Sequence, residues 1–519
     1  MRGFAILDWV VLLAYLTGMV LVGVRFARRQ KSLAEFFLAS RSVPVWAASL
    51  AIVATSVSAV TFLGAPEDAY RNNLTYLSLN LAALIAVLVV AVVFIPAFYR
   101  HHAATIYQLI GDRLGPGAQK ATSAAFMGGR LLASGARLYV AAIPTSLLLF
   151  GNLEPTNLYV SILLTTLIAT AYTMCGGIHA VIWTEVPQAL LFFAAAVAAL
   201  VLLWMRIDLP AAEVLSALRD ANAADGSSKL TLIDTRWDPM LAFSLPSALL
   251  GFTLFNMAVY GADHDLAQRM LTCKSAVRGA WSAILSNIIG FVVALLFLAI
   301  GLLLFLYYQR PDLVHNAPAA PPDDSRQIFL HFILTEIPPG LRGLMIAGVV
   351  AAAMSSLASS LSAMSSTLVC DFYKPLRPNR PDAAYVRASR AAVLLWSVLL
   401  GAVACFCVAW QQSSDESLLQ FAIGVMIFAY AGLLAVFLTA LLTKRGSAWS
   451  AGAALIIGAL VVAALKFPNT FHLPESVLGV PLRLSSGYQM LVATVIAFLV
   501  CILGRRAPRA SAPGGGARA

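Results

Sequence analysis

The sequence predicts an all-α polytopic membrane protein. The chain has 519 residues, of which 60% are hydrophobic and only 11% are charged, and its mean hydropathy is +0.83. A soluble protein of this length would carry far more charge on its surface. Apolar runs of about 18 residues or more recur along the chain, and each is long enough to form a membrane-spanning helix. Two of these runs are interrupted by polar residues, glycine or proline, as in helices that break inside a membrane.

Clusters of charged and turn-forming residues divide the apolar runs into about thirteen predicted transmembrane helices. Their approximate ranges are 5–25, 43–70, 76–98, 121–150, 157–175, 180–206, 239–262, 279–308, 341–371, 389–410, 417–442, 447–466 and 486–504. The longest polar loops, about 207–238 and 309–340, contain Pro and Asp and are expected to form short caps outside the membrane. No connecting segment is large enough to form a separate soluble domain.

The formal net charge of +11 comes from short basic clusters between the apolar runs, which argues against a nucleic-acid partner and for a lipid bilayer as the environment. Basic clusters mark the cytoplasmic loops of membrane proteins. The clusters expected inside the cell include Arg25, Arg28, Arg29, Lys31, Lys374, Arg377, Arg380, Arg387 and Arg390. The positive-inside rule therefore predicts a multi-pass protein of the cell inner (plasma) membrane, with its N-terminus outside and its C-terminus in the cytoplasm.

The predicted helix 341–371 carries a stripe of small and hydroxylated residues. At about 100° per residue, one face of this helix holds Gly348, Ala352, Ser355, Ser356, Ser359 and Ser366. Hydrocarbon offers no hydrogen-bond partners, so the stripe must face protein, water or a ligand. Two interpretations follow: close packing of helices through small residues, or a site in which neutral oxygens bind a hard cation such as Na⁺.

The two interrupted runs lie five helices apart. In the predicted helix 43–70, hydroxyl groups, glycine and proline occur together at Thr55, Ser56, Ser58, Thr61, Gly64 and Pro66. In the predicted helix 239–262, Asn256 and Gly261 interrupt the apolar run. A broken helix exposes main-chain carbonyl groups, and an ion satisfies them efficiently. This spacing is typical of two inverted five-helix repeats.

Four segments of the sequence carry a resemblance to a known family. They are FFLASRSVPVWAASLAIVATSVSAVTFLG, YTMCGGIHAVIWTEVPQ, DLAQRMLTCKS and AAAMSSLASSLSAMSSTLVCDFY. In order and spacing they resemble the sodium/solute symporter family, which includes sodium/galactose, proline, pantothenate and sialic-acid transporters. The resemblance covers roughly residues 5–445.

The resemblance implies a LeuT-type core of ten helices in two inverted repeats. It divides the chain into an extra N-terminal helix and cytoplasmic loop at 1–42, a first repeat at 43–206, an external loop at 207–238, a second repeat at 239–442, two C-terminal helices at 443–506 and a disordered tail at 507–519.

The resemblance also implies a sodium site. The principal site of the family falls on the carbonyl groups of Ala54, Val57 and Ala352 and on the hydroxyl groups of Ser355 and Ser356. This correspondence supplies a partner for the hydroxylated stripe and favours the cation interpretation over simple packing. A site of five neutral oxygens without a carboxylate is expected to bind Na⁺ weakly, which suits an ion that must be released.

A second ion site is left open by the resemblance. Some members of the family hold a further sodium ion with an Asp and nearby hydroxyl groups. Here the position of that Asp is Glu185, and one hydroxyl position is Ala358, which leaves Ser355 and Ser359. Glu185 either contributes to a second ion site with Ser359, carries a proton, or reaches the cytoplasmic interface without binding an ion.

The family's solute site implies a set of polar candidates along the core helices. They are Ser58, Thr61, Tyr76, Asn80, Arg130, Arg137, Asn256, Tyr260 and Gln420. Sialic-acid transporters use one Arg of the third core helix to bind the substrate carboxylate, and the match falls between Arg130 and Arg137 without choosing one. Asn80 and Gly290 replace a Glu and a Lys of the galactose pattern, which argues against the same hexose geometry. For each candidate the alternative is a buried polar residue that bridges helices.

Together these residues imply a sodium-coupled secondary active symporter that imports a small polar organic solute by alternating access. The expected solute is a sugar or an acidic sugar such as sialic acid, with Na⁺ as the coupling ion. The alternative is a proton-coupled or sodium-coupled carrier of a monocarboxylate or an amino acid. A channel or a sensor is less favoured, because neither repeated pore-lining rings nor an output module is evident. An enzyme is not expected, because no HExxH or Walker motif occurs. The sequence leaves the oligomeric state open.

Overall fold

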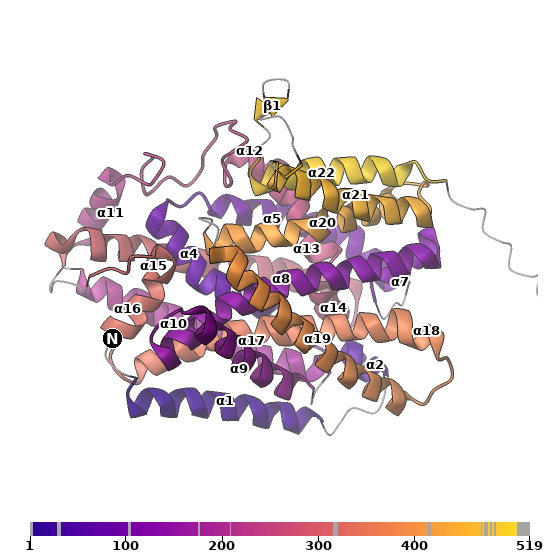
Figure 1. Cartoon of the computed structure of the whole chain (residues 1–519), viewed down its shortest axis with the longest axis horizontal. Coiled ribbons are helices and arrows are strands. Elements are labelled where there is room, and N and C mark those ends of the chain that lie inside the picture. The colour runs from indigo at the N-terminus through magenta and orange to yellow at the C-terminus, as the bar shows by residue number, and fades with distance from the viewer. Residues whose placement is uncertain are drawn as a thin grey trace, which may run out of the picture.

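Each apolar range of the sequence forms a helix, or a bent series of helices, in the computed structural model (Figure 1). The structure describes residues 4–27, 33–101, 105–174, 177–207, 209–314, 320–412, 417–468, 470–471, 476–477, 480–481 and 484–505. The tail at 507–519, which is expected to be disordered, lies outside these residues.

The long helices run side by side along the axis of the bundle (Figure 1). The continuous ones are α1 (Ile6–Ala27), α8 (Pro116–Phe150), α9 (Pro155–Thr173), α10 (Ile178–Arg206), α15 (Ala276–Gln309), α19 (Asp382–Gln412), α20 (Leu418–Leu442), α21 (Ala448–Lys466) and α22 (Ser486–Ile502). Those that contain a π-helical turn are α5–η2–α6 (Leu77–Val89, Val90–Phe94, Ile95–Arg100), α12–η3–α13 (Leu245–Ser247, Ala248–Phe252, Thr253–Gly261) and α17–η6–α18 (Leu341–Thr367, Leu368–Tyr373, Lys374–Leu376).

Shorter elements connect the long helices. They are α2 (Leu33–Leu38), η1 (Ala39–Arg41), α7 (Tyr107–Leu114), α11 (Ala211–Asp220), η4 (Pro311–Leu313), η5 (Ser325–Gln327) and α16 (Ile328–Glu336). A small antiparallel hairpin of β1 (Ser476–Val477) and β2 (Val480–Pro481) lies between α21 and α22.

Among the described residues, eight helices are long and apolar enough to cross a membrane. Two further pairs of helices pass the same test together, although each pair is bent. Three apolar helices are shorter, at Ile6–Val22, Pro155–Ala171 and Ser486–Ile502. These elements follow the predicted order, so the all-α membrane architecture is confirmed, while the total of thirteen spans stays a prediction.

Both helix breaks occur where the sequence places them. The first separates α3 (Val45–Ser56) from α4 (Ala59–Arg71) with a bend of 63°, and the second separates α13 from α14 (His264–Leu271) with a bend of 55°. Each new helix begins with a side-chain cap: the Ser58 hydroxyl accepts a hydrogen bond from the Val60 amide at 3.2 Å, and the Asp263 carboxylate accepts one from the Asp265 amide at 2.8 Å. The second break therefore lies just after Gly261.

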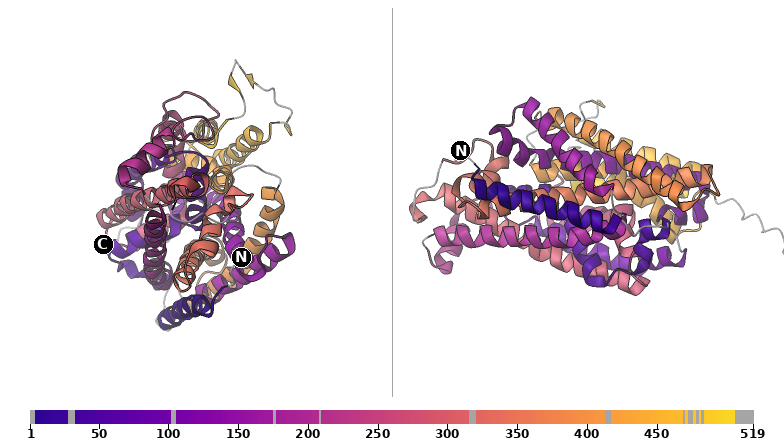
Figure 2. Two further views of the ribbon diagram at one scale, coloured as in Figure 1. Left: turned by 90° about the vertical axis from the view of Figure 1, so that its left-hand side faces the viewer. Right: turned by 90° about the horizontal axis from the view of Figure 1, so that it is seen from below.

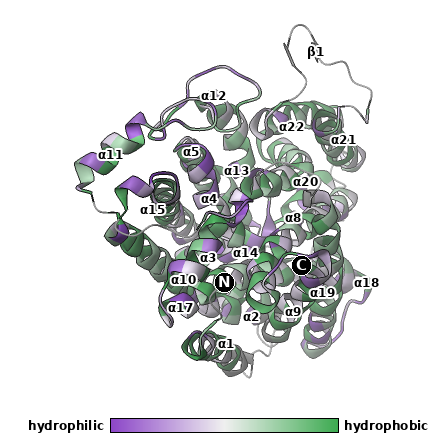
Figure 3. Ribbon diagram, turned by 60° about the vertical axis from the view of Figure 1, so that its left-hand side comes forward, coloured by the Kyte–Doolittle hydropathy of each residue, from purple (hydrophilic) through white to green (hydrophobic). Residues whose placement is uncertain are grey.

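The hydroxylated helix α17 lies at the centre of the bundle. In its most apolar window 89% of the residues are buried, against 39% in α19 and 33% in α21. Helix α1 lies along one edge of the bundle and α21 and α22 along the opposite edge, as the views in Figures 1 and 2 agree. The outer helices are mostly apolar on the hydropathy scale of Figure 3. The polar stripe of α17 therefore faces protein rather than lipid.

A buried ion pair fixes α1 to the start of α17. Asp8 is fully buried, and its carboxylate accepts hydrogen bonds from Arg342 Nε at 2.9 Å and Nη2 at 2.7 Å. The same carboxylate accepts hydrogen bonds from the amides of Gly340 at 2.7 Å and Gly343 at 2.9 Å. A Cβ at Gly343 would lie 2.6 Å from Asp8 Cα, so only glycine permits this close approach.

Candidate functional site

A cavity of about 160 Å³ opens at the first helix break, between α3–α4, α5, α8, α13, α15 and α20. We call it the central cavity. Eight of the nine solute candidates line it: Ser58, Thr61, Tyr76, Asn80, Arg130, Arg137, Asn256 and Tyr260. The fold therefore gathers polar groups from distant parts of the chain around one space.

Gln420 is the solute candidate that the structure places elsewhere. Its neighbour Leu419 lines the central cavity, whereas Gln420 lines a different one, of about 280 Å³, together with Asn72 and Gln489. We call this second space the Gln420 cavity. This differs from the expectation, because successive residues of a helix point about 100° apart and α20 directs Gln420 away from the centre.

The two arginines of α8 have different surroundings. The guanidinium of Arg130 is fully engaged: Nη1 donates to Asp263 Oδ2 at 2.9 Å, Nη2 donates to Asp265 Oδ2, and Nε donates to Ser360 Oγ at 2.9 Å. Its charge is therefore balanced by two carboxylates, which orient it as a bridge between helices.

Arg137, two turns further along α8, has no such partner. Its Nη1 has no hydrogen-bond partner among the described residues, and its Nη2 lies 3.6 Å from the sulfur of Met426. The side chain of Arg137 is half-buried, and its charge faces no carboxylate among the described residues, so this guanidinium can bind an anion that enters the central cavity. The structure thus separates two arginines that the sequence leaves equivalent.

The hydroxylated stripe of α17 meets the end of α3. Ser355 Oγ donates to the carbonyl of Ala54 at 2.7 Å, and Ser356 Oγ donates to the carbonyl of Thr55 at 3.2 Å. Both hydroxyl groups also lie near the carbonyl oxygen of Ala352, at 3.0 and 3.3 Å. Val57 occupies the break itself, in extended conformation, and lines the central cavity.

This set of oxygens fits a sodium ion. Hydroxyl and carbonyl oxygens are the ligands that hard cations prefer, and here they converge from two elements far apart in the sequence. The hydrogen bonds that join them would be replaced by contacts to the ion, so no buried oxygen would lose its partner.

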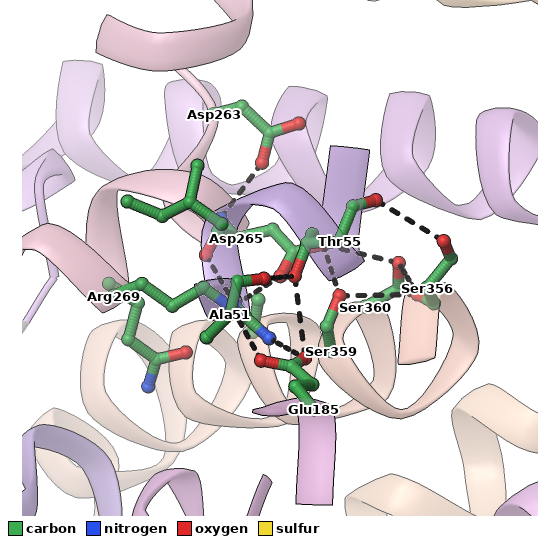
Figure 4. A network of polar contacts seen from close by, with 12 residues as sticks. Ala51, Thr55, Glu185, Asp263, Asp265, Arg269, Ser356, Ser359 and Ser360 are labelled. Atoms are coloured by element: carbon green, nitrogen blue, oxygen red, sulfur yellow. Dashed lines mark hydrogen bonds and ion pairs between the residues drawn. The ribbon is translucent and has the colours of Figure 1, made fainter. Parts of the chain in front are cut away.

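A chain of buried charges surrounds this region (Figure 4). Arg269 of α14 donates from Nε to Glu185 Oε2 at 3.0 Å and also contacts Glu185 Oε1, and its Nη1 donates to Asp265 Oδ1 at 2.8 Å. Thr55 Oγ1 lies 3.3 Å from Glu185 Oε1. Since Glu185 is fully buried, it does not reach the cytoplasmic interface.

Glu185 and Ser359, the candidates for a second ion, have separate partners. Ser359 Oγ donates to Asp265 Oδ2 at 2.9 Å, whereas Glu185 is paired with the guanidinium of Arg269. In this arrangement an arginine side chain supplies the positive charge that a second cation would bring. A further ion at Glu185 would have to share this carboxylate with the guanidinium of Arg269 or displace it.

Four residues of this network were not predicted as site residues: Asp263, Asp265, Arg269 and Tyr430. Tyr430 OH of α20 donates to Asp263, so the second helix break is joined to α8, α17 and α20 at once. The signal was present in the segment GADHDLAQRM, which places two acids and a base in an apolar region where isolated charges are costly.

A helical bundle with two broken helices, a central polar cavity and a hydroxylated helix beside one break defines a secondary transporter rather than an enzyme. The family model of the sodium:solute symporter family matches residues 36–458. The chain belongs to the sodium:solute symporter family.

Sialic acid symporters are among the proteins similar to this chain. The sodium/sialic acid symporter SiaT of Proteus mirabilis (strain HI4320) is 29% identical over 476 residues, which cover 91% of this chain and 92% of that protein. The sodium/sialic acid symporter NanT of Aliivibrio fischeri (strain ATCC 700601 / ES114) is 28% identical over 404 residues, covering 78% of this chain and 77% of that protein. The solved structure of a Na⁺-coupled sialic acid symporter in a substrate-bound outward-open state superposes with a TM-score of 0.81 at 26% identity, covering 96% of this chain and 97% of that one.

These findings confirm the expected class. The protein is a multi-pass membrane transporter with a LeuT-type fold, and it couples a small solute to sodium. It is a symporter and not an enzyme.

Proposed function

We propose that this protein imports an acidic sugar of the sialic acid class together with Na⁺. The observation that carries the proposal is the guanidinium of Arg137, which lines the central cavity and lacks an acceptor on Nη1 among the described residues. A guanidinium binds a carboxylate through two parallel hydrogen bonds. The two sialic acid symporters that resemble this chain over most of its length support the choice of solute.

The remaining polar groups of the central cavity are proposed to bind the hydroxyl and amide groups of the sugar. Ser58 and Thr61 come from the first break, Asn80 from α5 and Asn256 from α13. Tyr76 and Tyr260 provide flat faces with polar ends at the same cavity. Arg130 is proposed to position Asp263 and Asp265 rather than to touch the solute, because its donors are already used.

The sodium ion is proposed to bind the carbonyl oxygens of Ala54, Val57 and Ala352 and the hydroxyl oxygens of Ser355 and Ser356. The contacts of 2.7 and 3.2 Å between α17 and the end of α3 support this site. Since α3–α4 also supplies solute ligands, an ion that ties α3 to α17 orders the solute site as well. Coupling then follows from one shared structural element.

One sodium ion per solute is the simplest stoichiometry for this arrangement. Glu185 is paired with Arg269, and Ser359 with Asp265, so a second ion at Glu185 and Ser359 requires a rearrangement of both pairs. Breaking a buried ion pair costs about 3–5 kcal/mol, which opposes such a rearrangement.

The transport cycle is proposed to alternate access by movement of the first repeat, 43–206, against the second, 239–442, with the helices at 1–42 and 443–506 as flanking elements. The basic clusters of the loops support an orientation with the N-terminus outside and the C-terminus in the cytoplasm of a cell whose plasma membrane holds the protein. In that orientation the inward sodium gradient and the membrane potential drive import.

The size of the central cavity favours a second candidate. Its volume of about 160 Å³ is below the range of about 300–1,000 Å³ that is usual for ligand pockets, so a sialic acid requires a wider state of the cavity. A small monocarboxylate would meet Arg137 without this widening. Sodium-coupled transport of a monocarboxylate is therefore the second candidate function.

Uptake into proteoliposomes distinguishes the two. We expect N-acetylneuraminate to accumulate when external K⁺ is replaced by Na⁺ at fixed pH, and lactate not to compete. Arg137→Gln is expected to abolish this uptake while Na⁺ still raises the melting temperature of the purified variant, which shows that it folds and binds the ion. Uptake that persists in Arg137→Gln, or that follows a proton gradient without Na⁺, contradicts the proposal, whereas competition by lactate with uptake of lactate favours the second candidate.

A further inference from the structure

The loop before α12 places a lysine inside the protein at the end of α4. Lys229 is among the largest fully buried side chains of the described residues, with 1% of its surface exposed. It lines neither the central cavity nor the Gln420 cavity, and the proposed transport mechanism does not use it. A buried ammonium group is costly unless other groups compensate its charge, so the contacts of Lys229 show what holds it there.

The ammonium group of Lys229 caps the last turn of α4. Its Nζ donates to the carbonyl of Tyr70 at 2.6 Å and to the carbonyl of Ala69 at 3.4 Å. The carbonyl groups in the last turn of a helix have no amide partner within the helix, and the helix dipole is negative at this end. The cation of Lys229 therefore satisfies two acceptors and complements the dipole of α4.

Two further groups compensate the charge of Lys229. The Nζ atom lies over the ring of Phe305 on α15, 4.3 Å from the centroid, in a cation–π contact. The carboxylate of Asp68 attracts the ammonium group. Asp68 is buried, and its Oδ2 has no hydrogen-bond partner among the described residues. One cation thus holds the loop, α4 and α15 together.

The rest of this loop is bonded to the junction of α4 and α5. Three hydrogen bonds join the two segments: from the amide of Ala224 to the carbonyl of Arg71 at 3.2 Å, from the amide of Leu74 to the carbonyl of Thr231 at 3.1 Å, and from Asn73 Nδ2 to Ser227 Oγ at 2.8 Å. Within the loop, the amide of Lys229 donates to the carbonyl of Ala221 at 3.0 Å. We call residues 221–231 the α4 clamp.

The α4 clamp holds the end of a helix that carries solute ligands at its start. Ser58 caps the first turn of α4 and Thr61 lies within that turn, and both line the central cavity. The break at Val57, with its bend of 63°, separates α4 from α3, so α3 does not fix the direction of α4. Because α4 is one helix of 13 residues, the position of its clamped end decides how its first turn faces the central cavity.

We propose that Lys229 is a positioning residue for the solute site: its ammonium group holds the end of α4 against α15 and so fixes Ser58 and Thr61 at the central cavity. The inference rests on the proposed function only for the identity of the solute. The ligands proposed for Na⁺ on α3 and α17 lie on the other side of the break, so Na⁺ binding without solute does not require the clamp.

Hydrogen exchange of the backbone amides of the purified full chain tests the position of α4 without any solute. Lys229→Met removes the charge and is expected to speed the exchange of α4 about tenfold relative to α3 in the same protein, because fewer contacts oppose local opening. Ser227→Ala, which removes the hydrogen bond from Asn73, is expected to give a smaller change in the same direction. Lys120→Met is the matched control, since Lys120 is exposed on α8 and lines neither cavity; exchange as in the wild-type protein is expected.

Equilibrium binding of radiolabelled N-acetylneuraminate in Na⁺ tests the effect on the solute site. Lys229→Met is expected to weaken this binding about tenfold, while the Na⁺ concentration that half-saturates the rise in melting temperature without solute stays unchanged. A lysine that only stabilised the fold would affect both affinities or neither. The difference between the two affinities is therefore the sign of a positioning role.

The outcomes separate this inference from the proposed function. Unchanged exchange of α4 in Lys229→Met and Ser227→Ala, or an equal loss of affinity for solute and for Na⁺ in Lys229→Met, overturns the positioning role and leaves the proposed function intact. If Lys229→Met does not fold, the same two measurements on Ser227→Ala decide. Absence of Na⁺-dependent binding of N-acetylneuraminate to the wild-type protein overturns the sialic acid proposal, and the exchange of α4 then decides the positioning role alone.

Discussion

Removal of the Ser355 hydroxyl group tests the proposed sodium site directly. This hydroxyl lies 2.7 Å from the carbonyl oxygen of Ala54 and 3.0 Å from that of Ala352, so it is placed between two of the proposed ligands. In the ion-bound state it contacts a charge, an interaction that contributes about 1.5–3 kcal/mol. Ser355→Ala is therefore expected to raise the half-saturating Na⁺ concentration by about 10- to 150-fold, since about 1.4 kcal/mol corresponds to a factor of ten.

The measurement is the Na⁺ dependence of the melting temperature in detergent without solute, followed by the Na⁺ dependence of uptake. Ser362→Ala is the matched control on the same helix. Ser362 is buried, and its hydroxyl has no hydrogen-bond partner among the described residues, so its removal breaks no hydrogen bond among them. The control is expected to keep the half-saturating Na⁺ concentration of the wild-type protein.

The reasoning is refuted by a half-saturating Na⁺ concentration in Ser355→Ala equal to that of Ser362→Ala. A lower melting temperature in Na⁺-free buffer is a separate effect, because Ser355→Ala also leaves the Ala54 carbonyl without its hydrogen bond. Comparison of the Na⁺-induced shift within each variant removes this contribution to stability.

Three further predictions follow from buried charges. Asp8→Ala leaves Arg342 without its carboxylate in a buried position and is expected to destabilise the protein by about 3–5 kcal/mol, seen as a lower melting temperature, with a smaller loss in Asp8→Asn. Asp263→Asn removes one of the two carboxylates that balance the charge of Arg130, and so leaves more positive charge at the central cavity. The affinity for dicarboxylates relative to monocarboxylates, measured by competition of uptake, is expected to rise at least about tenfold. An unchanged ratio of the two affinities would contradict the idea that Asp263 balances Arg130. Burial lowers the pKa of Lys229, in the loop before α12, to about 8. Between about pH 8 and the ordinary pKa of 10.5, the native state binds fewer protons than the unfolded state, so the stability of the protein rises with pH across this window. The melting temperature is therefore expected to rise with pH in the wild-type protein and not in Lys229→Met. The same slope in Lys229→Met would show that Lys229 is not the group responsible.

Much of the fold could be predicted from local patterns. Apolar runs and charge clusters predict where helices begin and end, because a helix in a membrane must satisfy its own backbone and place its charges in water. The breaks near Val57 and Gly261 were evident from hydroxyl groups, glycine and proline in apolar surroundings, and both occur in the structure. The hydroxylated stripe of α17 was evident from helical periodicity alone.

Contacts between distant segments decided the rest. Arg130 and Arg137 are the same residue type on one helix. Only the position of Asp263 and Asp265, more than a hundred residues away, gives Arg130 two carboxylate partners and leaves Nη1 of Arg137 without a partner among the described residues. In the same way, the sequence shows Glu185 as an isolated acid, whereas the fold pairs it with Arg269.

The sequence by itself determined a helical membrane protein, the two breaks, the hydroxylated helix and, through its motifs, the family. Those features depend on residues close together in the chain and on the solvent that each must face. Only the tertiary structure decided which guanidinium is available to a carboxylate, that Ser355 meets Ala54, and that Gln420 lines a separate cavity. The reason is that the packing of whole helices sets the partners of a side chain inside a bundle. This packing brings together residues that are far apart in the sequence, and their contact cannot be predicted from their spacing along the chain.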